Sequence, residues 1–461
     1  MALFKRHEFS QNSITEGVIW KNLLAFFFPI LLGTFFQQLY NTADAVIVGK
    51  FVGKEALAAV GGATGTLVNL VVGFFVGLSS GATVILSQFY GGRRDREVSQ
   101  AVHTAAAMSL AGGALFTVLG IVFSPVILRW MGTPADVLVH AEVYVRIYFA
   151  GMIPSLIYNV GAGLLRAVGD SRRPLYFLIS ACMVNIVLDV LLVVGLEMGV
   201  AGAALATIFS QAVSAVLVVL TLLRSHQAYR LEPRKIRFYG NLLDRIVRIG
   251  FPAGLQSVMY SLSNIIIQAS INAFGTDIVA AYTAYGKLDG LYWMMINAFG
   301  VSITTFVGQN FGAGKYDRVK EGLKACLFMV VVFSLLITVI IFLFGNQLLS
   351  LFLDPGDTSG ALGYGLAYMH TVSVFYILMG MLFVPNGMLR GAGDMGAFTF
   401  SSMANLFSRV AIAYILAYLT PLGANSIWWS IPAGWAIGAS VSLLRVKSGK
   451  WMRRSVADMV S

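Results

Sequence analysis

Long apolar runs dominate the sequence, and short polar segments separate them. Twelve of these runs approach or exceed about 20 residues, the helical length that crosses a hydrocarbon core about 30 Å thick. The runs lie at 23–48, 56–86, 100–126, 137–160, 174–196, 199–223, 246–273, 278–308, 322–346, 361–386, 397–419 and 426–445. The pattern therefore predicts an all-α integral membrane protein with twelve transmembrane helices.

The composition agrees with this prediction, because 57% of the residues are hydrophobic and 11% are charged, whereas soluble proteins carry about 25% charged residues. The net charge of +11 does not indicate a nucleic-acid partner, since the basic residues gather in alternate loops and at both ends of the chain. The only basic residues in the remaining loops are Lys50, Lys54 and Arg129. By the positive-inside rule, we expect a multi-pass protein of the cell (inner or plasma) membrane with both termini in the cytoplasm.

The two halves of the sequence resemble each other in four segments that recur in the same order. FFPILLGTFFQQLYNTAD (27–44) matches GFPAGLQSVMYSLSNIII (250–267), and SQFYGGRRDREV (87–98) matches GQNFGAGKYDRV (308–319). LLRAVGD (164–170) matches MLRGAGD (388–394), and MVNIVLDV (183–190) matches MANLFSRV (403–410). Such an ordered set indicates an internal repeat.

Each half contributes six helices, an even number, so both halves insert with the same orientation. This predicts two six-helix lobes related by a pseudo-two-fold axis along the membrane normal, an arrangement in which the lobes rock around a central cavity. The expected organisation is a cytoplasmic leader (1–22), an N-terminal lobe (23–223), a cytoplasmic linker (224–245), a C-terminal lobe (246–445) and a cytoplasmic tail (446–461).

Two features predict structure rather than chemistry. Gly73, Gly77 and Gly81 share one helical face and are typical of close helix packing through small residues. Cys182 and Cys326 lie apart in apolar runs and belong to no metal-binding motif. We therefore expect no disulfide, no cofactor and no metal, apart from a monovalent cation as coupling ion.

The first apolar run contains Pro29 and a polar stripe, Gln37, Asn41 and Asp44, at positions i, i+4 and i+7 of one helical face. A carboxylate facing lipid costs about 2.5 to 3.5 kcal/mol, so Asp44 is expected to face protein or a water-filled cavity. The alternative is that Asp44 lies close enough to the outer end of its helix to reach water.

Counting residues along the predicted helices brings five polar side chains to one depth in the first half. Two carboxylates in a desolvated pocket cannot both ionise cheaply, and such a pair can bind and release a proton. Together with amide and hydroxyl oxygens, the pair can also coordinate a hard cation. The predicted cation-coupling residues are Asp44, Tyr144, Asn185, Asp189 and Thr207. The alternative is a buried ion pair of one aspartate with Arg146.

The second half lacks these acids. Ile267 occupies the place of Asp44 in the repeat, and Arg409 occupies the place of Asp189. Asp289 is the one acid well inside the second half, and Arg409 is a candidate partner for it. Cation coupling is therefore expected in the first lobe.

Aromatic and methionine side chains near the expected lobe interface can form an adaptable wall for large cationic ligands. The alternative for each of them is lipid contact or core packing. The predicted substrate-cavity residues are Gln37, Tyr40, Asn41, Tyr260, Asn264 and Met294.

The chain resembles the MATE family of multidrug and toxic compound extrusion transporters over nearly its whole length. The resemblance rests on the helix from Pro29 to Asp44, the Gln-x-x-Gly loops at Gln88 and Gln309, both LRxxGD turns, and NIVLDVLLVVG followed by GVAGAALAT. It implies a twelve-helix, two-lobed antiporter that exports cationic amphiphiles against proton or sodium entry. Its expected partners are therefore small-molecule substrates and not nucleic acid.

The resemblance also implies roles for individual residues. It assigns the coupling site to Asp44, Asn185, Asp189 and Thr207, with Tyr144, and a helix bend to Pro29. Tyr260 and Gly380 replace the second-lobe acids of the NorM-like branch, so the chain is more similar to the DinF-like branch. We expect a monomer in a lipid bilayer.

Two other functions stay open at this point. A flippase for lipid-linked precursors, within the same superfamily, would use basic cavity residues such as Arg146, Lys287 and Arg409. A membrane scaffold or enzyme is the other alternative, but the five histidines are scattered and form no catalytic cluster with the acids. We therefore expect a transporter and not an enzyme.

Overall fold

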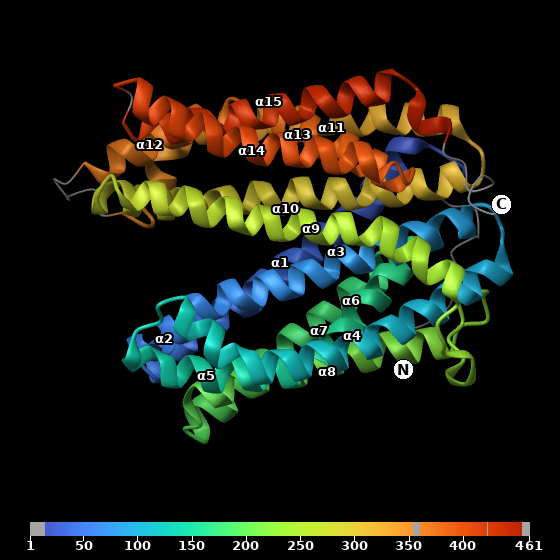
Figure 1. Ribbon diagram of the computed structural model, residues 1–461, viewed down its shortest axis with the longest axis horizontal. Coiled ribbons are helices and arrows are strands. Elements are labelled where there is room, and N and C mark those ends of the chain that lie inside the picture. The colour runs from blue at the N-terminus through green and yellow to red at the C-terminus, as the bar shows by residue number, and fades with distance from the viewer. Residues whose placement is uncertain (1–13, 354–359, 422, 454–461) are drawn as a thin grey trace. The chain divides into compact units, whose positions relative to one another are not determined.

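The computed structural model describes residues 14–353, 360–421 and 423–453, and within these ranges all regular secondary structure is helical (Figure 1). The first thirteen residues of the predicted leader and residues 454–461 of the predicted tail lie outside the described ranges. The helices are α1 (Ile19–Phe51), α2 (Lys54–Gly61), α3 (Ala63–Gly91), α4 (Asp95–Trp130), α5 (Ala135–Ala150), α6 (Met152–Ala167), α7 (Arg172–Asp189), η1 (Val190–Gly195), α8 (Gly199–Leu223), η2 (Pro233–Lys235), α9 (Gly240–Asn272), α10 (Thr276–Gly312), α11 (Tyr316–Leu349), α12 (Ala361–Ser373), α13 (Tyr376–Gly391), α14 (Met395–Leu419), α15 (Asn425–Lys447) and η3 (Lys450–Arg453).

The described helices account for all twelve predicted membrane crossings. Nine spans are long and apolar enough to cross a bilayer, and two bent pairs, α5 with α6 and α12 with α13, raise the number to eleven. The remaining long helix is α9, with 33 residues, whose charged first turns and polar stripe make it less apolar. Each predicted run lies inside its helix or helix pair to within one residue.

The fourth and tenth crossings are each a bent pair of helices, a feature that the sequence did not predict. The α5–α6 pair bends by 53° at Gly151, and the α12–α13 pair bends by 48° after Ser373. The apolar pattern continues through both breaks, so it gives no sign of them. The end of α7 also departs from a regular helix, because the π-helical turn η1 follows Asp189 directly.

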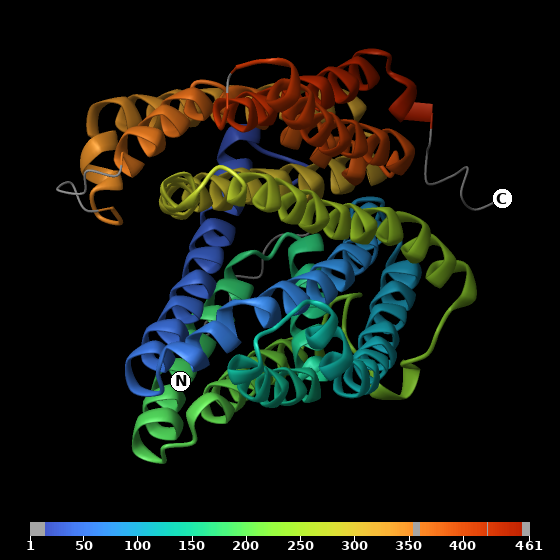
Figure 2. The ribbon, with the colours of Figure 1, turned by 60° about the vertical axis from the view of Figure 1, so that its left-hand side comes forward.

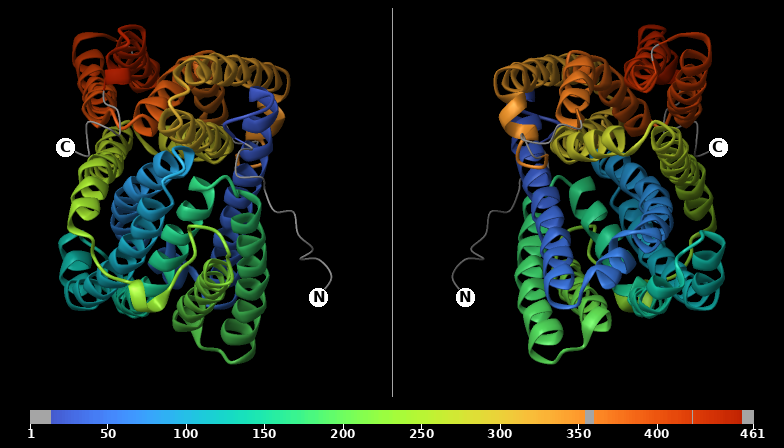
Figure 3. Two further views of the ribbon diagram at one scale, coloured as in Figure 1. Left: turned by 90° about the vertical axis from the view of Figure 1, so that its right-hand side faces the viewer. Right: turned by 90° about the vertical axis from the view of Figure 1, so that its left-hand side faces the viewer.

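The chain divides into two compact units, which we describe separately. The first unit comprises Phe28–Ser257, and the second comprises Ile14–Phe27 together with the described residues from Val258 onward. The predicted limits of the lobes and linker stay predictions. In the first unit α7 lies beside α8 (Figure 3), while α6 packs against α3, α4 and α8. In the second unit α14 lies beside α15 (Figure 2), and α13 packs against α10, α11 and α15.

The predicted glycine ridge of α3 packs closely within the first unit. A Cβ atom at Gly77 would overlap the backbone of Gly254 on α9, and one at Gly81 would overlap the backbone at Gly250. Small residues on both helices therefore let the two backbones approach each other. This confirms the ridge as a packing surface.

The sequence repeat extends to the backbone of the loops. In each LRxxGD turn the glycine is left-handed, with φ of 98° at Gly169 and 82° at Gly393. The amide of the following aspartate donates to the carbonyl five residues earlier, at 2.9 Å for Asp170 and 2.8 Å for Asp394. Similarly, Arg93 (φ 55°) adopts the left-handed conformation of its repeat partner Gly314 (φ 72°), although glycine alone adopts it without cost. The same bend thus ends the corresponding helices of both halves.

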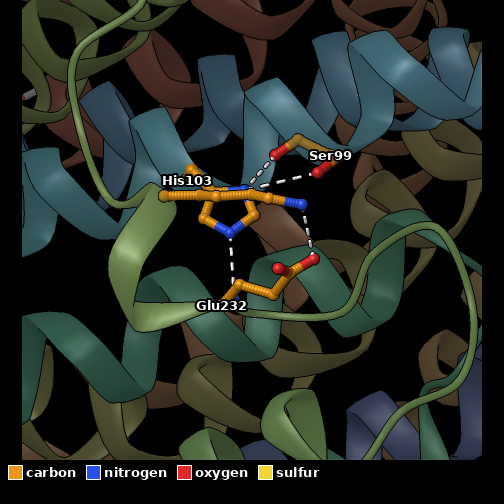
Figure 4. Close-up of polar contacts among 4 residues, drawn as sticks. Ser99, His103 and Glu232 are labelled. Atoms are coloured by element: carbon orange, nitrogen blue, oxygen red, sulfur yellow. Dashed lines mark hydrogen bonds and ion pairs between the residues drawn. The ribbon is translucent and has the colours of Figure 1, made fainter.

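A buried histidine anchors the segment between α8 and α9 to the first unit. His103 on α4 is fully buried, with Nδ1 2.6 Å from the carbonyl oxygen of Ser99 and Nε2 3.0 Å from the backbone nitrogen of Glu232 (Figure 4). These partners define a neutral imidazole in which Nδ1 donates and Nε2 accepts. Lys235 donates to the Glu232 carboxylate at 2.8 Å and thereby lowers the pKa of Glu232.

Candidate functional site

The first unit brings all five predicted coupling residues into buried positions. Asp44 (α1), Tyr144 (α5), Asn185 and Asp189 (α7) and Thr207 (α8) are at most 7% exposed. Thr207 Oγ1 lies 3.1 Å from Asp44 Oδ2 and 3.0 Å from the carbonyl oxygen of Ala203, so the two acceptors share one hydroxyl proton. Asp44 therefore does not reach water at the helix end, which was the alternative for it.

The other members of the cluster surround the Asp44 carboxyl group. The side chains of Asn185 and Asp189 lie against it, and Tyr144 lies against Thr207. Among the described residues, Asp44 Oδ1, both carboxylate oxygens of Asp189 and both amide atoms of Asn185 are buried without a hydrogen-bond partner. Buried polar atoms normally have partners, so these are the atoms of the cluster that a proton, a cation or water could still satisfy.

The donor set fits a proton or a hard monovalent cation. Carboxylate, amide and hydroxyl oxygens are hard ligands, and the described residues contain no group of three or more His, Cys, Asp or Glu side chains that could hold a metal ion. A proton on one carboxyl group, or a cation between the oxygens, would relieve the repulsion between Asp44 and Asp189.

The alternative ion pair with Arg146 is absent from the described part of the chain. Arg146 is exposed, and no described ion pair joins it to Asp44 or Asp189. Pro29 lies inside α1, where it lacks an amide hydrogen for the carbonyl four residues earlier. The missing bond is a local weak point in α1, and the bend at Pro29 stays a prediction.

The six predicted cavity residues divide between the two units. In the first unit Gln37 and Asn41 are exposed, whereas Tyr40 is buried. In the second unit Tyr260, Asn264 and Met294 are half-buried. Each unit therefore presents part of the set, and a common cavity stays a prediction.

The second unit contains a polar cluster that sequence reasoning recognised only in part. Asp289 Oδ1 accepts hydrogen bonds from the hydroxyls of Tyr376 at 2.8 Å and Tyr285 at 3.4 Å, and the two hydroxyls are 2.7 Å apart. Arg409 Nη1 donates to Asn264 Oδ1 at 3.1 Å. The suggested pairing of Asp289 with Arg409 is not among the described ion pairs, because the tyrosine hydroxyls hold the carboxylate instead. Tyr285 precedes Asp289 by one helical turn, which is the signal that could have identified it.

Membrane-crossing helices, duplicated helix ends and a buried cluster of ionisable groups define a polytopic membrane protein with an internal repeat. The MatE family model matches residues 29–191 and 252–418, more than half of the chain. The chain belongs to the MATE family of multidrug efflux transporters, which are multi-pass proteins of the cell membrane with small-molecule substrates.

Individual relatives agree with this assignment. The chain is 30% identical to the probable multidrug resistance protein YpnP of Bacillus subtilis (strain 168), over 95% of this chain and 97% of that protein. It is 28% identical to the probable multidrug resistance protein YoeA of the same organism, over 91% of each. A crystal structure of a MATE protein in the bent conformation superposes with a TM-score of 0.89 at 24% identity, covering 96% of this chain and 98% of the other, and thus shows the same fold.

Proposed function

We propose that this chain is an antiporter of the DinF-like branch that exports cationic amphiphilic compounds by alternating access, driven by entry of protons or Na⁺. The observation that carries the proposal is the first-unit cluster, in which Asp44 and Asp189 share a buried site with oxygen atoms that have no partner among the described residues. The distribution of Lys and Arg supports a topology with both termini in the cytoplasm.

The cluster supports coupling through simple electrostatics. Two ionised carboxylates in a desolvated site repel each other, so the site favours a state loaded with a proton or cation. Hydration of the site from the cytoplasmic side would favour release. One charge moving through a potential of 100 mV supplies about 2.3 kcal/mol, enough to bias an equilibrium between two conformations.

The neighbouring backbone provides a place where the site can change shape. The π-helical turn Val190–Gly195 follows Asp189, and such turns occur frequently at functional sites. A rearrangement of this turn would alter the distance between the two carboxylates without unfolding α7.

The test is efflux from vesicles that contain the purified protein, with a pH gradient or a Na⁺ gradient imposed separately. Asp44→Asn and Asp189→Asn are expected to abolish gradient-driven efflux, because a neutral amide cannot load and release a positive charge. Asp317→Asn is the matched control, since the Asp317 side chain is 93% exposed. Efflux at the wild-type rate in both site variants, under the gradient that drives the wild type, would refute the proposal.

A further inference from the structure

The second unit contains a buried arginine that takes no part in the proposed cation-coupling site. Arg409 on α14 is 6% exposed and occupies the place of Asp189 in the repeat. No described carboxylate oxygen lies within ion-pair distance of its guanidinium group. A buried charge without a counter-ion is costly, so an arginine in a membrane bundle indicates an electrostatic role.

The described side-chain contacts of the guanidinium group are with neutral groups. Nη1 donates to Asn264 Oδ1 at 3.1 Å, and the Tyr282 hydroxyl lies against the guanidinium. Nε is buried without a hydrogen-bond partner among the described residues, as is Oδ1 of Asn405 one turn earlier on α14. Arg409 therefore retains unused donor capacity in a site that contains hydroxyl and amide groups.

The nearby acid does not neutralise this charge by direct contact. Asp289 feels the Arg409 charge, but its Oδ1 accepts from the hydroxyls of Tyr376 and Tyr285. Behind Arg409, a Cβ atom at Gly434 on α15 would lie 2.9 Å from Arg409 Cβ, so α15 packs directly against this part of α14. The close packing of α15 thus holds the base of the Arg409 side chain in place.

Two partly exposed tyrosines, Tyr260 and Tyr282, lie near the guanidinium. Tyr282 stacks on Tyr368 with 5.6 Å between ring centroids, and Tyr260 meets Trp293 edge-on at 5.1 Å. Tyr260 and Tyr282 both lie within the electrostatic reach of Arg409. A planar aromatic ligand with a carboxylate group would match a guanidinium fork that has aromatic rings close by.

From this geometry we infer that Arg409, with Asn264 and Tyr282, binds the carboxylate of zwitterionic aromatic substrates. The inference rests on the proposed function and narrows it, because a carrier with this site accepts amphiphiles that combine a cationic group with a carboxylate. Arg409 supplies a planar fork of donors, and Asn264 and Tyr282 orient it.

The test uses two dyes that differ only at the carboxyl group: rhodamine 110, which carries a free carboxylate, and its methyl ester, rhodamine 123. Arg409→Gln should lower efflux of rhodamine 110 about tenfold or more while leaving that of the ester unchanged, since a charge-assisted pair is lost for one dye alone. Arg409→Lys should retain part of the rhodamine 110 activity. Arg129→Gln, at a residue whose side chain is 66% exposed, is the matched control.

Equal losses for both dyes, or no loss for rhodamine 110, would overturn the inference. Binding of each dye to purified protein in detergent, measured by fluorescence anisotropy, separates this failure from failure of the proposed function. The wild type should bind rhodamine 110 more tightly than Arg409→Gln does, even if neither dye is exported. Phosphatidylglycerol serves as a competitor, and displacement of rhodamine 110 by equimolar lipid would identify a lipid phosphate as the ligand and overturn the carboxylate assignment.

Discussion

The ion pair between Asp394 and Arg445 offers a direct test of how the second unit is held together. Asp394 lies in the LRxxGD turn before α14, is 1% exposed, and accepts a hydrogen bond from Arg445 Nε on α15 at 2.6 Å. Arg445→Met would leave a buried carboxylate without its cation. Breaking a buried pair from one side costs about 3 to 5 kcal/mol, and we expect the lower end because the Arg445 side chain is 27% exposed.

The equivalent turn of the first half supplies a matched control. Asp170 accepts hydrogen bonds from the backbone amides of Arg172 and Arg173 at 3.2 and 3.1 Å, so it keeps partners when the Arg173 side chain is removed. The Arg173 side chain is also 45% exposed, and an exposed pair contributes about 0 to 1 kcal/mol. Arg173→Met should therefore change stability little.

The assay is thermal unfolding in detergent, followed by the monodisperse fraction on size exclusion. For a unit of about 200 residues, 3 kcal/mol corresponds to a decrease in Tm of about 6 to 12 °C. The double variant Asp394→Leu with Arg445→Met should recover most of that decrease, because no buried charge remains. A Tm for Arg445→Met equal to that of Arg173→Met would refute the reasoning.

Three further predictions concern the first unit. Gly77→Val should cost about 1 to 3 kcal/mol or more in thermal unfolding, because its side chain meets the Gly254 backbone, whereas Gly286→Val meets open space and should cost less. His103→Phe removes the acceptor for the Glu232 amide and should speed proteolysis of residues 224–239, while unchanged cleavage would contradict the anchoring role. Burial raises the pKa of the Asp170 carboxyl group, so the stability that the protonated group provides is present below pH 4 and is lost as the pH rises. Asp170→Asn stays neutral and can still cap α7, so its stability should increase relative to that of the wild type from pH 4 to pH 7. Thermal melting at several pH values measures this difference.

Hydropathy sufficed to predict the membrane crossings because each depends on an average over about 20 residues. It did not predict the bend at Gly151 or the π-helical turn after Asp189, because local backbone geometry there leaves the apolar pattern intact. The same averaging explains why helix ends were less accurate than helix positions.

The first-unit cluster could be predicted because depth along each helix can be counted from the sequence. Asp44, Asp189 and Thr207 meet although more than 140 residues separate the first two in the chain. The partners of Asp289 could not all be found in this way. Tyr376 comes from a helix whose bend precedes it, and helix rotation, which sequence spacing alone does not fix between different helices, decides that its hydroxyl meets the carboxylate.

The left-handed backbone at Arg93 shows that the two halves of the repeat can share a conformation while their residues differ. Glycine suits this conformation and a side chain costs about 1 to 2 kcal/mol there, yet the turn has the shape found at Gly314. The two halves thus share this main-chain conformation although only one of them has the residue best suited to it. By contrast, the equivalent positions Asp189 and Arg409 have side chains of opposite charge. The two halves therefore share a backbone, but their buried polar sites favour ligand groups of opposite charge.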